Sequence, residues 1–309
     1  MPDGGIELRS VLAGGHRLAY RVAGPADGPA VVLLHGLASD SQTWDLAMRP
    51  LAAGGLRALA LDLLGHGESD KPASVRYLLE DFARCVRDFL DALKIDSAVI
   101  CGHSFGGAIA VHFAANYRPR TTHLVLVSAG GLGREVHAIL RAASLPIAPV
   151  VLRMVSGPRL RRLYGRPQVH RVLGLTPEHL VNLQRTGRAL GSAAGQAAFF
   201  ASLRGVIEPR GQRGSFLEMR TIPPDLPVLL MWSARDGVIP VAHARSAHVA
   251  LPNSRLVVFD EGRHEPHRSN ADLFAAGLAD FLRSQSMGLQ SRSAGSSATI
   301  GAWPTVDAG

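Results

Sequence analysis

The chain has 309 residues, a hydrophobic fraction of 47%, and a net charge of +8 from 33 Lys and Arg against 25 Asp and Glu. That apolar fraction supports a large core and excludes a wholly disordered chain, while the presence of only two cysteines excludes a small disulfide-rich scaffold. Met1-Pro2-Asp3-Gly4-Gly5 opens the chain without the apolar stretch of a signal peptide, and no run of about 18 apolar residues follows. We therefore expect a cytoplasmic protein in which Cys85 and Cys101 are buried thiols.

Short aliphatic or β-branched runs alternate along the chain with helical patterns. Strands are expected at residues 17–22, 31–34, 57–61, 98–101, 123–127, 228–232 and 255–259. Helices are expected at residues 44–53, 82–93, 105–116, 241–249 and 272–282. Because strands that alternate with helices form parallel sheets covered on both faces, the pattern predicts an α/β fold around a mostly parallel central sheet.

One long segment, residues 134–220, interrupts this alternation. It has helical patches and many Gly and Pro residues but no clear strand, so we predict that it forms an inserted helical cap. The core then comprises residues 1–133 and 221–283. Residues 284–309 are rich in Ser, Gly and Ala, and we predict that they form a disordered tail.

The most specific motif lies at a strand-to-helix turn. Cys101-Gly102-His103-Ser104-Phe105-Gly106-Gly107 follows one expected strand and opens the next expected helix, which is the context of a G-x-S-x-G nucleophile elbow. Gly102 and Gly106 keep the crowded turn free of Cβ clashes, so we predict that Ser104 is an exposed nucleophile. The Phe105 N–H begins the helix and can donate to a developing oxyanion. The loop His35-Gly36-Leu37 follows the expected strand 31–34 at the same carboxyl edge of the sheet. We predict that the Leu37 N–H is the second donor to the oxyanion.

A serine nucleophile needs a general base, and the base needs a carboxylate to orient it. In this arrangement the acid and then the histidine follow the serine along the chain. Of thirteen histidines, only His264 and His267 come after the last expected strand. His264 lies nearer to that strand, in the loop, and is the predicted base.

The predicted acid is Asp236, which closely follows the expected strand 228–232. Asp260 is near His264 in the sequence but lies at the end of its own strand. The competing loop at residues 128–131 has no carboxylate. We therefore predict that Asp236 orients His264.

Together these motifs resemble the α/β-hydrolase superfamily over residues 31–282. The matching segments are His35-Gly36, Asp62-Leu63-Leu64-Gly65-His66-Gly67-Glu68-Ser69-Asp70, Gly102-His103-Ser104-Phe105-Gly106-Gly107, Asp236 with Pro240, and His264 with Pro266. The resemblance implies an α/β-hydrolase fold with an inserted cap, and it gives residues 62–70 a structural role without a part in catalysis. The chain departs from the family at Arg263, because the family usually has Gly directly before the catalytic histidine.

The nucleophile narrows the reaction that this resemblance implies. Haloalkane dehalogenases and epoxide hydrolases of the superfamily use Asp at the elbow, so Ser104 places the chain closer to esterases and lipases. We predict hydrolysis of a small-molecule carboxylic ester with an apolar acyl group, through an acyl-enzyme on Ser104. Lactones, thioesters and the C–C bonds of meta-cleavage products stay open as substrates. A ligand receptor that retains the triad is a further alternative.

A second glycine-rich segment bears on these alternatives. Gly130-Gly131-Leu132-Gly133 resembles a segment of the meta-cleavage C–C hydrolases, but those relatives often have Asn and Trp where this chain has His103 and Glu265. The same segment lacks the G-x-G-x-x-G spacing of a dinucleotide loop, so we expect no cofactor. His264 and His267 have no third ligand in the pattern, so we expect no metal.

The positive charge is concentrated in the predicted cap. Residues 134–220 contain 14 Arg, no Lys and four acidic residues, a net charge of +10, which leaves the rest of the chain at −2. Apolar runs at residues 145–152 and 197–200 lie in the same segment. Either this basic, amphipathic cap contacts anionic lipid or a substrate with an anionic head, or its apolar runs pack over the core. No recognition motif accompanies the charge, so we do not expect nucleic-acid binding.

Overall fold

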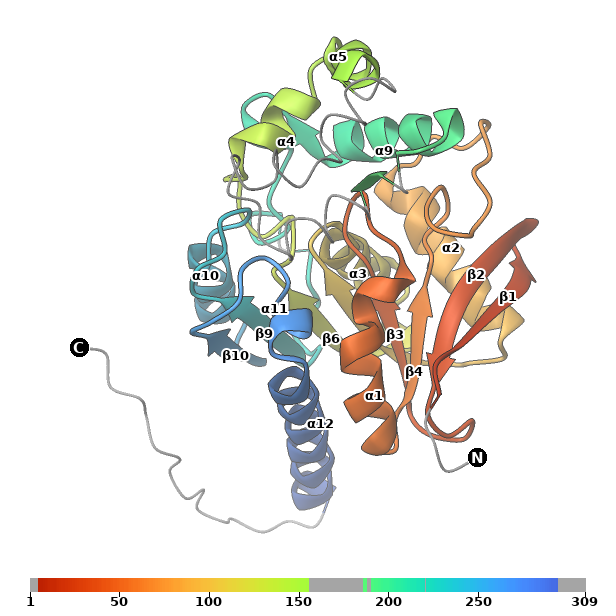
Figure 1. Ribbon diagram of the computed structural model, residues 1–309. Helices are drawn as coiled ribbons and strands as arrows, with labels where there is room; N and C mark the ends of the chain where they lie inside the picture. Colours follow the sequence, from red (N-terminus) through yellow and green to blue (C-terminus); the bar gives the residue numbers. More distant parts are fainter. Residues whose placement is uncertain (1–4, 156–185, 188–189, 220, 294–309) are drawn as a thin grey trace, which may run out of the picture.

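The computed structural model describes residues 5–155, 186–187, 190–219 and 221–293. A central sheet of eight strands has the order β1-β2-β4-β3-β5-β6-β9-β10 (Figure 1). Its strands are β1 (Glu7–Ala13), β2 (His16–Ala23), β3 (Ala30–Leu34), β4 (Arg57–Leu61), β5 (Ala98–His103), β6 (Thr121–Val127), β9 (Val228–Ser233) and β10 (Ser254–Phe259). β2 pairs antiparallel with β1 and β4, and all the other pairs are parallel. The predicted α/β fold with a mostly parallel sheet is confirmed.

The sequence pattern did not predict β1. This strand lies at the edge of the sheet, and four of its seven residues, Glu7 to Ser10, are exposed. An exposed edge strand has no buried face to impose an alternation of apolar residues, so the pattern on which the other strands were predicted is missing here.

Helices cover both faces of the sheet. They are α1 (Asp45–Ala53), α2 (Leu79–Ala92), α3 (Phe105–Asn116), α10 (Ala242–Ala250), α11 (Pro266–Ser269) and α12 (Ala271–Ser293), with short 3-10 turns η1 (Ser41–Trp44) and η2 (Arg118–Arg120). Side chains of β3 alternate between the two layers. Val32 and Leu34 pack with α2, α3 and α10, whereas Val31 and Leu33 pack with α1 and α12. This two-sided burial explains why the central strands are continuous apolar runs.

The predicted cap contains three described helices, α4 (Ala138–Ala143), α5 (Ala148–Val155) and α9 (Ala193–Val206), which lie above the sheet in Figure 1. A hairpin of two-residue strands, β7 (Ile207–Glu208) and β8 (Gly211–Gln212), follows α9. The sequence pattern did not indicate this hairpin, because strands of two residues leave no alternation to recognise. Residues 156–185 of the predicted cap are outside the described part of the chain.

The end of the core also differs from the prediction. α12 continues to Ser293, ten residues beyond the expected boundary at 283. The segment 284–293 contains Met287 and Leu289 and has no proline, so its serines and single glycine do not stop the helix. The remaining residues of the predicted disordered tail, 294–309, are not among those described.

The loop at residues 62–70 is anchored by Asp62. The Ser41 and Glu68 N–H groups each donate to a carboxylate oxygen of Asp62 over 2.7 Å, and the Ser69 hydroxyl donates to the Asp62 carbonyl over 2.6 Å. Gly67 has a φ of +47°, and a Cβ at this position would overlap the Asp62 carboxylate. These contacts give the loop the structural role that the family resemblance implies.

Two buried histidines join this loop to the one that follows β3. The Leu63 N–H donates to His35 Nε2 over 3.1 Å, and His35 Nδ1 donates to the Gly36 carbonyl over 2.8 Å. His66 Nδ1 donates to the Leu64 carbonyl over 3.1 Å, and its ring centroid is 5.2 Å from that of His35. Burial lowers the pKa of both side chains, that of His66 to about 3. Both rings are therefore neutral at neutral pH and act as neutral donors.

No helix within the described residues is long and apolar enough to cross a bilayer.

Acidification is predicted to destabilise the fold through His66. The unfolded chain protonates this histidine below a pKa of about 6.5, whereas the folded chain keeps it neutral down to about 3. The free energy of unfolding therefore falls by up to about 1.4 kcal/mol per pH unit across this window. Urea denaturation between about pH 7 and about pH 5 should show that His66→Gln loses about 2 kcal/mol less stability than the unaltered chain. Equal losses in the two proteins would contradict the assignment.

Candidate active site

Ser104 lies at the turn between β5 and α3 in a left-handed backbone conformation, with φ 53° and ψ −116°. Its N–H donates to the Val127 carbonyl over 3.0 Å, and its carbonyl accepts from the Gly130 N–H over 2.8 Å. A Cβ on Gly102 would overlap the Gly106 carbonyl, and one on Gly106 would overlap the Leu34 carbonyl. The turn is therefore possible only with glycine at both positions, and it holds Ser104 in a conformation that costs about 1–3 kcal/mol.

His264 reaches Ser104 from the loop between β10 and α11. Its Nε2 is 2.9 Å from the Ser104 Oγ, and its side chain is 18% exposed. A serine hydroxyl that donates to Nε2 requires the ring proton to be on Nδ1. That tautomer points the Nδ1–H at Asp236 and leaves Nε2 free to take the serine proton.

Asp236 lies in the loop after β9, with a side chain that is fully buried. Its two carboxylate oxygens are 2.9 and 3.1 Å from His264 Nδ1. The Val238 and Ile239 N–H groups donate to Oδ1 over 2.8 and 3.0 Å. Burial opposes ionisation, but the hydrogen bonds from His264 and the two backbone groups outweigh it and hold the pKa of Asp236 below its ordinary value. The carboxylate is thus charged at neutral pH and orients the imidazole.

The structure thus brings together Ser104, His264 and Asp236, and it separates the competing residues from them. His267 is fully buried at the start of α11, where its ring centroid is 4.2 Å from that of Trp44 and its Nε2 is 3.2 Å from the Thr43 hydroxyl. Asp260 is exposed at the end of β10. His267 is therefore a core histidine, and Asp260 is not the partner of His264.

The two predicted oxyanion donors belong to segments that lie next to Ser104. Phe105 is the first residue of α3, so its N–H has no partner carbonyl within the helix. Gly36 packs directly against the nucleophile, because a Cβ on it would lie 3.2 Å from the Ser104 Cβ. Leu37 follows Gly36, and its side chain packs against both the core and the cap. The loop after β3 is therefore beside the serine, as the prediction of a Leu37 donor requires.

His103 contacts the catalytic-base candidate His264, and the sequence did not indicate this contact. Its Nε2 is 2.7 Å from the His264 carbonyl, and because a carbonyl only accepts, Nε2 carries the ring proton. Its ring centroid is 4.8 Å from that of His264 and 4.6 Å from that of His267. Burial lowers the pKa of His103 to about 4, so this ring brings no second positive charge to His264 at neutral pH. No spacing in the sequence indicates this contact, since 161 positions separate the two residues.

Gln212 is a second residue that the sequence did not indicate. It comes from β8 of the cap and is buried. Its Oε1 accepts from the Gly131 N–H over 2.7 Å, and its Nε2 donates to the Glu135 carbonyl over 3.2 Å. Gln212 thus anchors the cap hairpin to the Gly130-Gly131 turn, which in turn binds the Ser104 carbonyl.

The cap contributes an apolar cluster next to the site. Its buried members are Phe199, Phe200, Leu203 and Ile207. Leu37 and Ala38, from the loop after β3, pack against this cluster. The cap cluster therefore contacts the same loop that lies beside Ser104.

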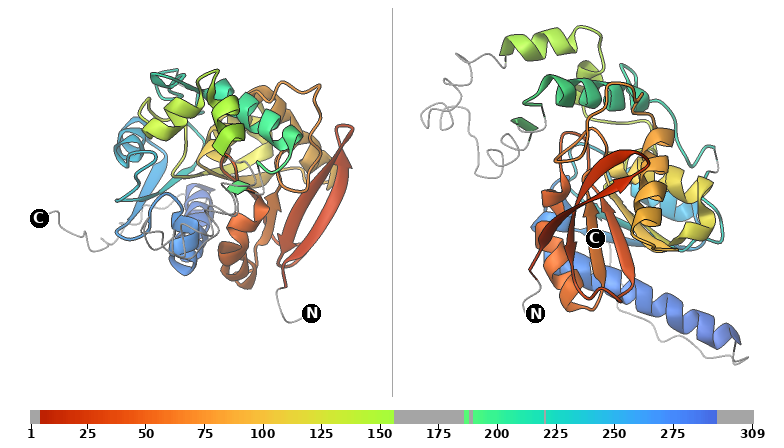
Figure 2. Two further views of the ribbon diagram at one scale, coloured as in Figure 1. Left: turned by 45° about the horizontal axis from the view of Figure 1, so that its top comes forward. Right: turned by 90° about the vertical axis from the view of Figure 1, so that its right-hand side faces the viewer.

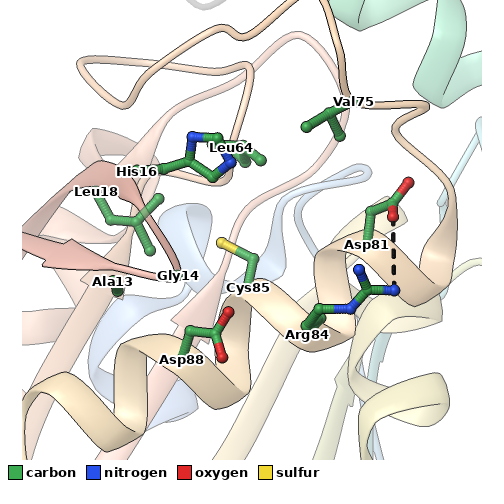
Figure 3. A pocket seen from close by; sticks show the side chains of 10 residues that line it. All are labelled: Ala13, Gly14, His16, Leu18, Leu64, Val75, Asp81, Arg84, Cys85 and Asp88. Atoms are coloured by element: carbon green, nitrogen blue, oxygen red, sulfur yellow. Dashed lines mark ion pairs between the residues drawn. The ribbon is translucent and has the colours of Figure 1, made fainter.

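A small cavity elsewhere in the molecule is separate from this site (Figure 3). Its volume is about 110 Å³, and it lies between the β1–β2 hairpin and α2, where Cys85 and an ion pair of Arg84 with Asp81 line it. Burial raises the pKa of the Cys85 thiol to about 12, so the sulfur is not a nucleophile at neutral pH. Cys85 and Cys101 are both free and buried, as predicted.

The described residues contain no group of three or more His, Cys, Asp or Glu side chains that could hold a metal ion.

The sequence and the structure are both similar to known proteins. A family model described as the alpha/beta hydrolase fold matches residues 29–271. The chain is 36% identical over 273 residues to an uncharacterized protein of Mycobacterium tuberculosis, covering 87% of this chain and 79% of that protein. It is 27% identical over 270 residues to the 2-hydroxy-6-oxo-6-phenylhexa-2,4-dienoate hydrolase of Burkholderia cepacia, covering 82% and 88%. A crystal structure of a bacterial membrane phospholipase A superposes with a TM-score of 0.71 at 25% identity, covering 91% of this chain and 86% of that one.

Asp236→Asn is predicted to reverse the tautomer of His264. The Asn oxygen would keep the two backbone hydrogen bonds and turn its NH₂ group toward His264 Nδ1, so the ring proton would move to Nε2, which faces Ser104. Nitrogen-15 NMR of histidine-labelled protein, assigned with His264→Gln, should show a protonated Nδ1 in the unaltered chain and a protonated Nε2 in the variant. An unchanged tautomer would contradict the assigned role of Asp236.

Proposed function

The chain belongs to the alpha/beta hydrolase family, and we propose that it is a hydrolase that cleaves carboxylic esters with an apolar acyl group through an acyl-enzyme on Ser104. The observation that carries the proposal is the continuous hydrogen-bonded chain from Ser104 through His264 to Asp236. Its two links measure 2.9 Å each. This is the arrangement that activates a serine hydroxyl for attack on a carbonyl carbon.

The first half of the reaction forms the acyl-enzyme. The Ser104 Oγ bonds to the carbonyl carbon as its proton passes to His264 Nε2, and the Phe105 and Leu37 N–H groups donate to the resulting oxyanion. The buried, ionised Asp236 stabilises the imidazolium. The carbon–oxygen bond to the alcohol then breaks, and His264 returns the proton to the leaving oxygen.

The second half releases the acid. Water attacks the acyl carbonyl while His264 Nε2 takes its proton, the same two N–H groups stabilise the second oxyanion, and the bond to Ser104 breaks as the serine regains its proton. Because His103 is neutral, it holds the His264 backbone without opposing the charge that the ring acquires in each half.

Several features favour an ester with an apolar acyl group. Ser104 in place of Asp disfavours the aspartyl chemistry of epoxide hydrolases, although one relative is described by that name. The cluster around Phe199 and Phe200 lies next to the loop that carries Leu37. The phospholipase A with a similar fold is a hydrolase of acyl esters. With two free, buried cysteines, the chain also suits a reducing compartment such as the cytoplasm.

A C–C hydrolase of meta-cleavage products is the second candidate. The relative from Burkholderia cepacia carries such an activity in its name, and the same triad can serve it. Against this candidate, the chain has His103 and Glu265 where those hydrolases often have Asn and Trp. A substrate panel separates the candidates. Faster cleavage of a dienol-ketone than of any ester or lactone would establish the C–C activity, and tight ligand binding without turnover would establish a receptor.

Ser104→Ala is predicted to abolish turnover with the fold intact. A series of p-nitrophenyl esters of increasing acyl length should show kcat reduced by about 10⁴-fold or more in the variant. In the unaltered chain, kcat/KM should rise by up to about fourfold for each CH₂ that the pocket buries. Ser10→Ala, at an exposed position of the edge strand β1, is the matched control and should leave the rates unchanged. Near-normal activity of Ser104→Ala would refute the mechanism.

A further inference from the structure

The outer part of the cap exposes large aliphatic side chains. Ile139 is 69% exposed, Leu145 38%, Ile147 62%, Val150 52% and Val151 47%. We refer to these five residues as the α4–α5 surface. Figure 1 and the right-hand view of Figure 2 both show α5 at the outer end of the cap, on the far side of α9 from the sheet. The five exposed residues belong to α4, to the turn that follows it and to α5, on the part of the cap that is farthest from the sheet.

The described side chains of α5, at residues 148–152, are apolar on both sides of the helix. Ala148 and Leu152 face inward and pack against the α9 cluster, whereas Val150 and Val151, one turn after Ile147, face outward. A helix that is apolar all round is stable in a protein core or at a membrane, and in water it has an unsatisfied face. The contacts with the α9 cluster bury only the inward face of α5. The outward face stays exposed to water, and an apolar partner would stabilise it.

Arginines lie at the base of this surface. The Arg204 guanidinium donates to the Ser144 and Leu145 carbonyls over 3.3 and 3.2 Å, and that of Arg141 donates to the Pro209 carbonyl over 2.8 Å. Neither guanidinium has a carboxylate within ion-pair distance among the described residues. Their positive charges are therefore not neutralised by these contacts, and each retains further N–H donors.

The charge of the cap favours one kind of partner. Two copies of this chain meeting through their caps would bring together two segments that each carry +10, which disfavours self-association. An anionic lipid surface offers an apolar region for the aliphatic side chains and negative charge for the arginines. Aliphatic side chains partition into the boundary between headgroups and acyl chains, and guanidinium groups bind the phosphates.

We propose that the α4–α5 surface docks on anionic lipid bilayers, with Ile147, Val150 and Val151 entering the headgroup–acyl boundary and Arg141 and Arg204 binding lipid phosphates. Docking in this orientation places the cap, and the apolar cluster beneath it, between the bilayer and Ser104. The interaction itself does not require ester hydrolysis, so it stands or falls independently of the proposed function.

Vesicle co-sedimentation of full-length Ser104→Ala protein tests the proposal without lipid turnover. Binding to vesicles of phosphatidylcholine with phosphatidylglycerol should be about tenfold or more tighter than to phosphatidylcholine alone, and should weaken at high salt. Ile147→Gln combined with Val150→Gln should reduce binding to anionic vesicles by about tenfold. Arg141→Gln combined with Arg204→Gln should weaken binding to anionic vesicles by about tenfold or more and leave binding to phosphatidylcholine alone unchanged.

A matched control comes from two helices of the core. Val249 on α10 and Leu273 on α12 are 88% and 63% exposed, so Val249→Gln combined with Leu273→Gln removes aliphatic groups at least as exposed as Ile147 and Val150 and should leave binding unchanged. Circular dichroism checks the fold of every variant. Absence of binding, equal binding to the two vesicle types, or equal losses in the cap variant and the control would each overturn the proposal. So would a dimer in sedimentation velocity that the Ile147 and Val150 changes dissociate.

Discussion

Ser104 has a backbone conformation, with φ 53° and ψ −116°, that a residue with a side chain keeps only when its surroundings hold it there. The Val127 carbonyl and the Gly130 N–H hold it from the adjacent strand β6 and the turn after it. Glycines 102 and 106 make room for the turn. Because of this strain, the Oγ projects from the edge of the sheet toward His264 instead of into the core.

The remaining parts of the site are arranged around that one oxygen. In a parallel sheet, the loops after neighbouring strands meet at the carboxyl edge, and here the loops after β3, β5, β9 and β10 converge there. The loop that carries Asp236 also binds the cap, because the Val238 carbonyl accepts from the His137 N–H over 3.0 Å. Gln212 joins the cap to the turn behind Ser104. The cap is thus attached both to the acid loop and to the nucleophile turn, which couples its position to the geometry of the triad.

The sequence sufficed for the fold and for the placement of Ser104, His264 and Asp236. Central strands buried on both faces are continuous apolar runs, and the nucleophile turn has strict steric requirements that leave a readable glycine pattern. By contrast, His103 and Gln212 act through partners far away in the sequence, so no local pattern indicates them. The exposed strand β1 and the two-residue strands of the cap were missed because neither feature depends on a periodic apolar face.

If Ser104 is the nucleophile, an alkyl fluorophosphonate should bond to its Oγ, and mass spectrometry of the intact protein and of its peptides detects that bond. We expect one adduct per chain, on the peptide that contains Ser104, and no adduct in Ser104→Ala. We also expect much slower labelling of His264→Gln, because that variant lacks the base. An adduct on another residue, or labelling of Ser104→Ala at the rate of the unaltered chain, would show that Ser104 is not the nucleophile.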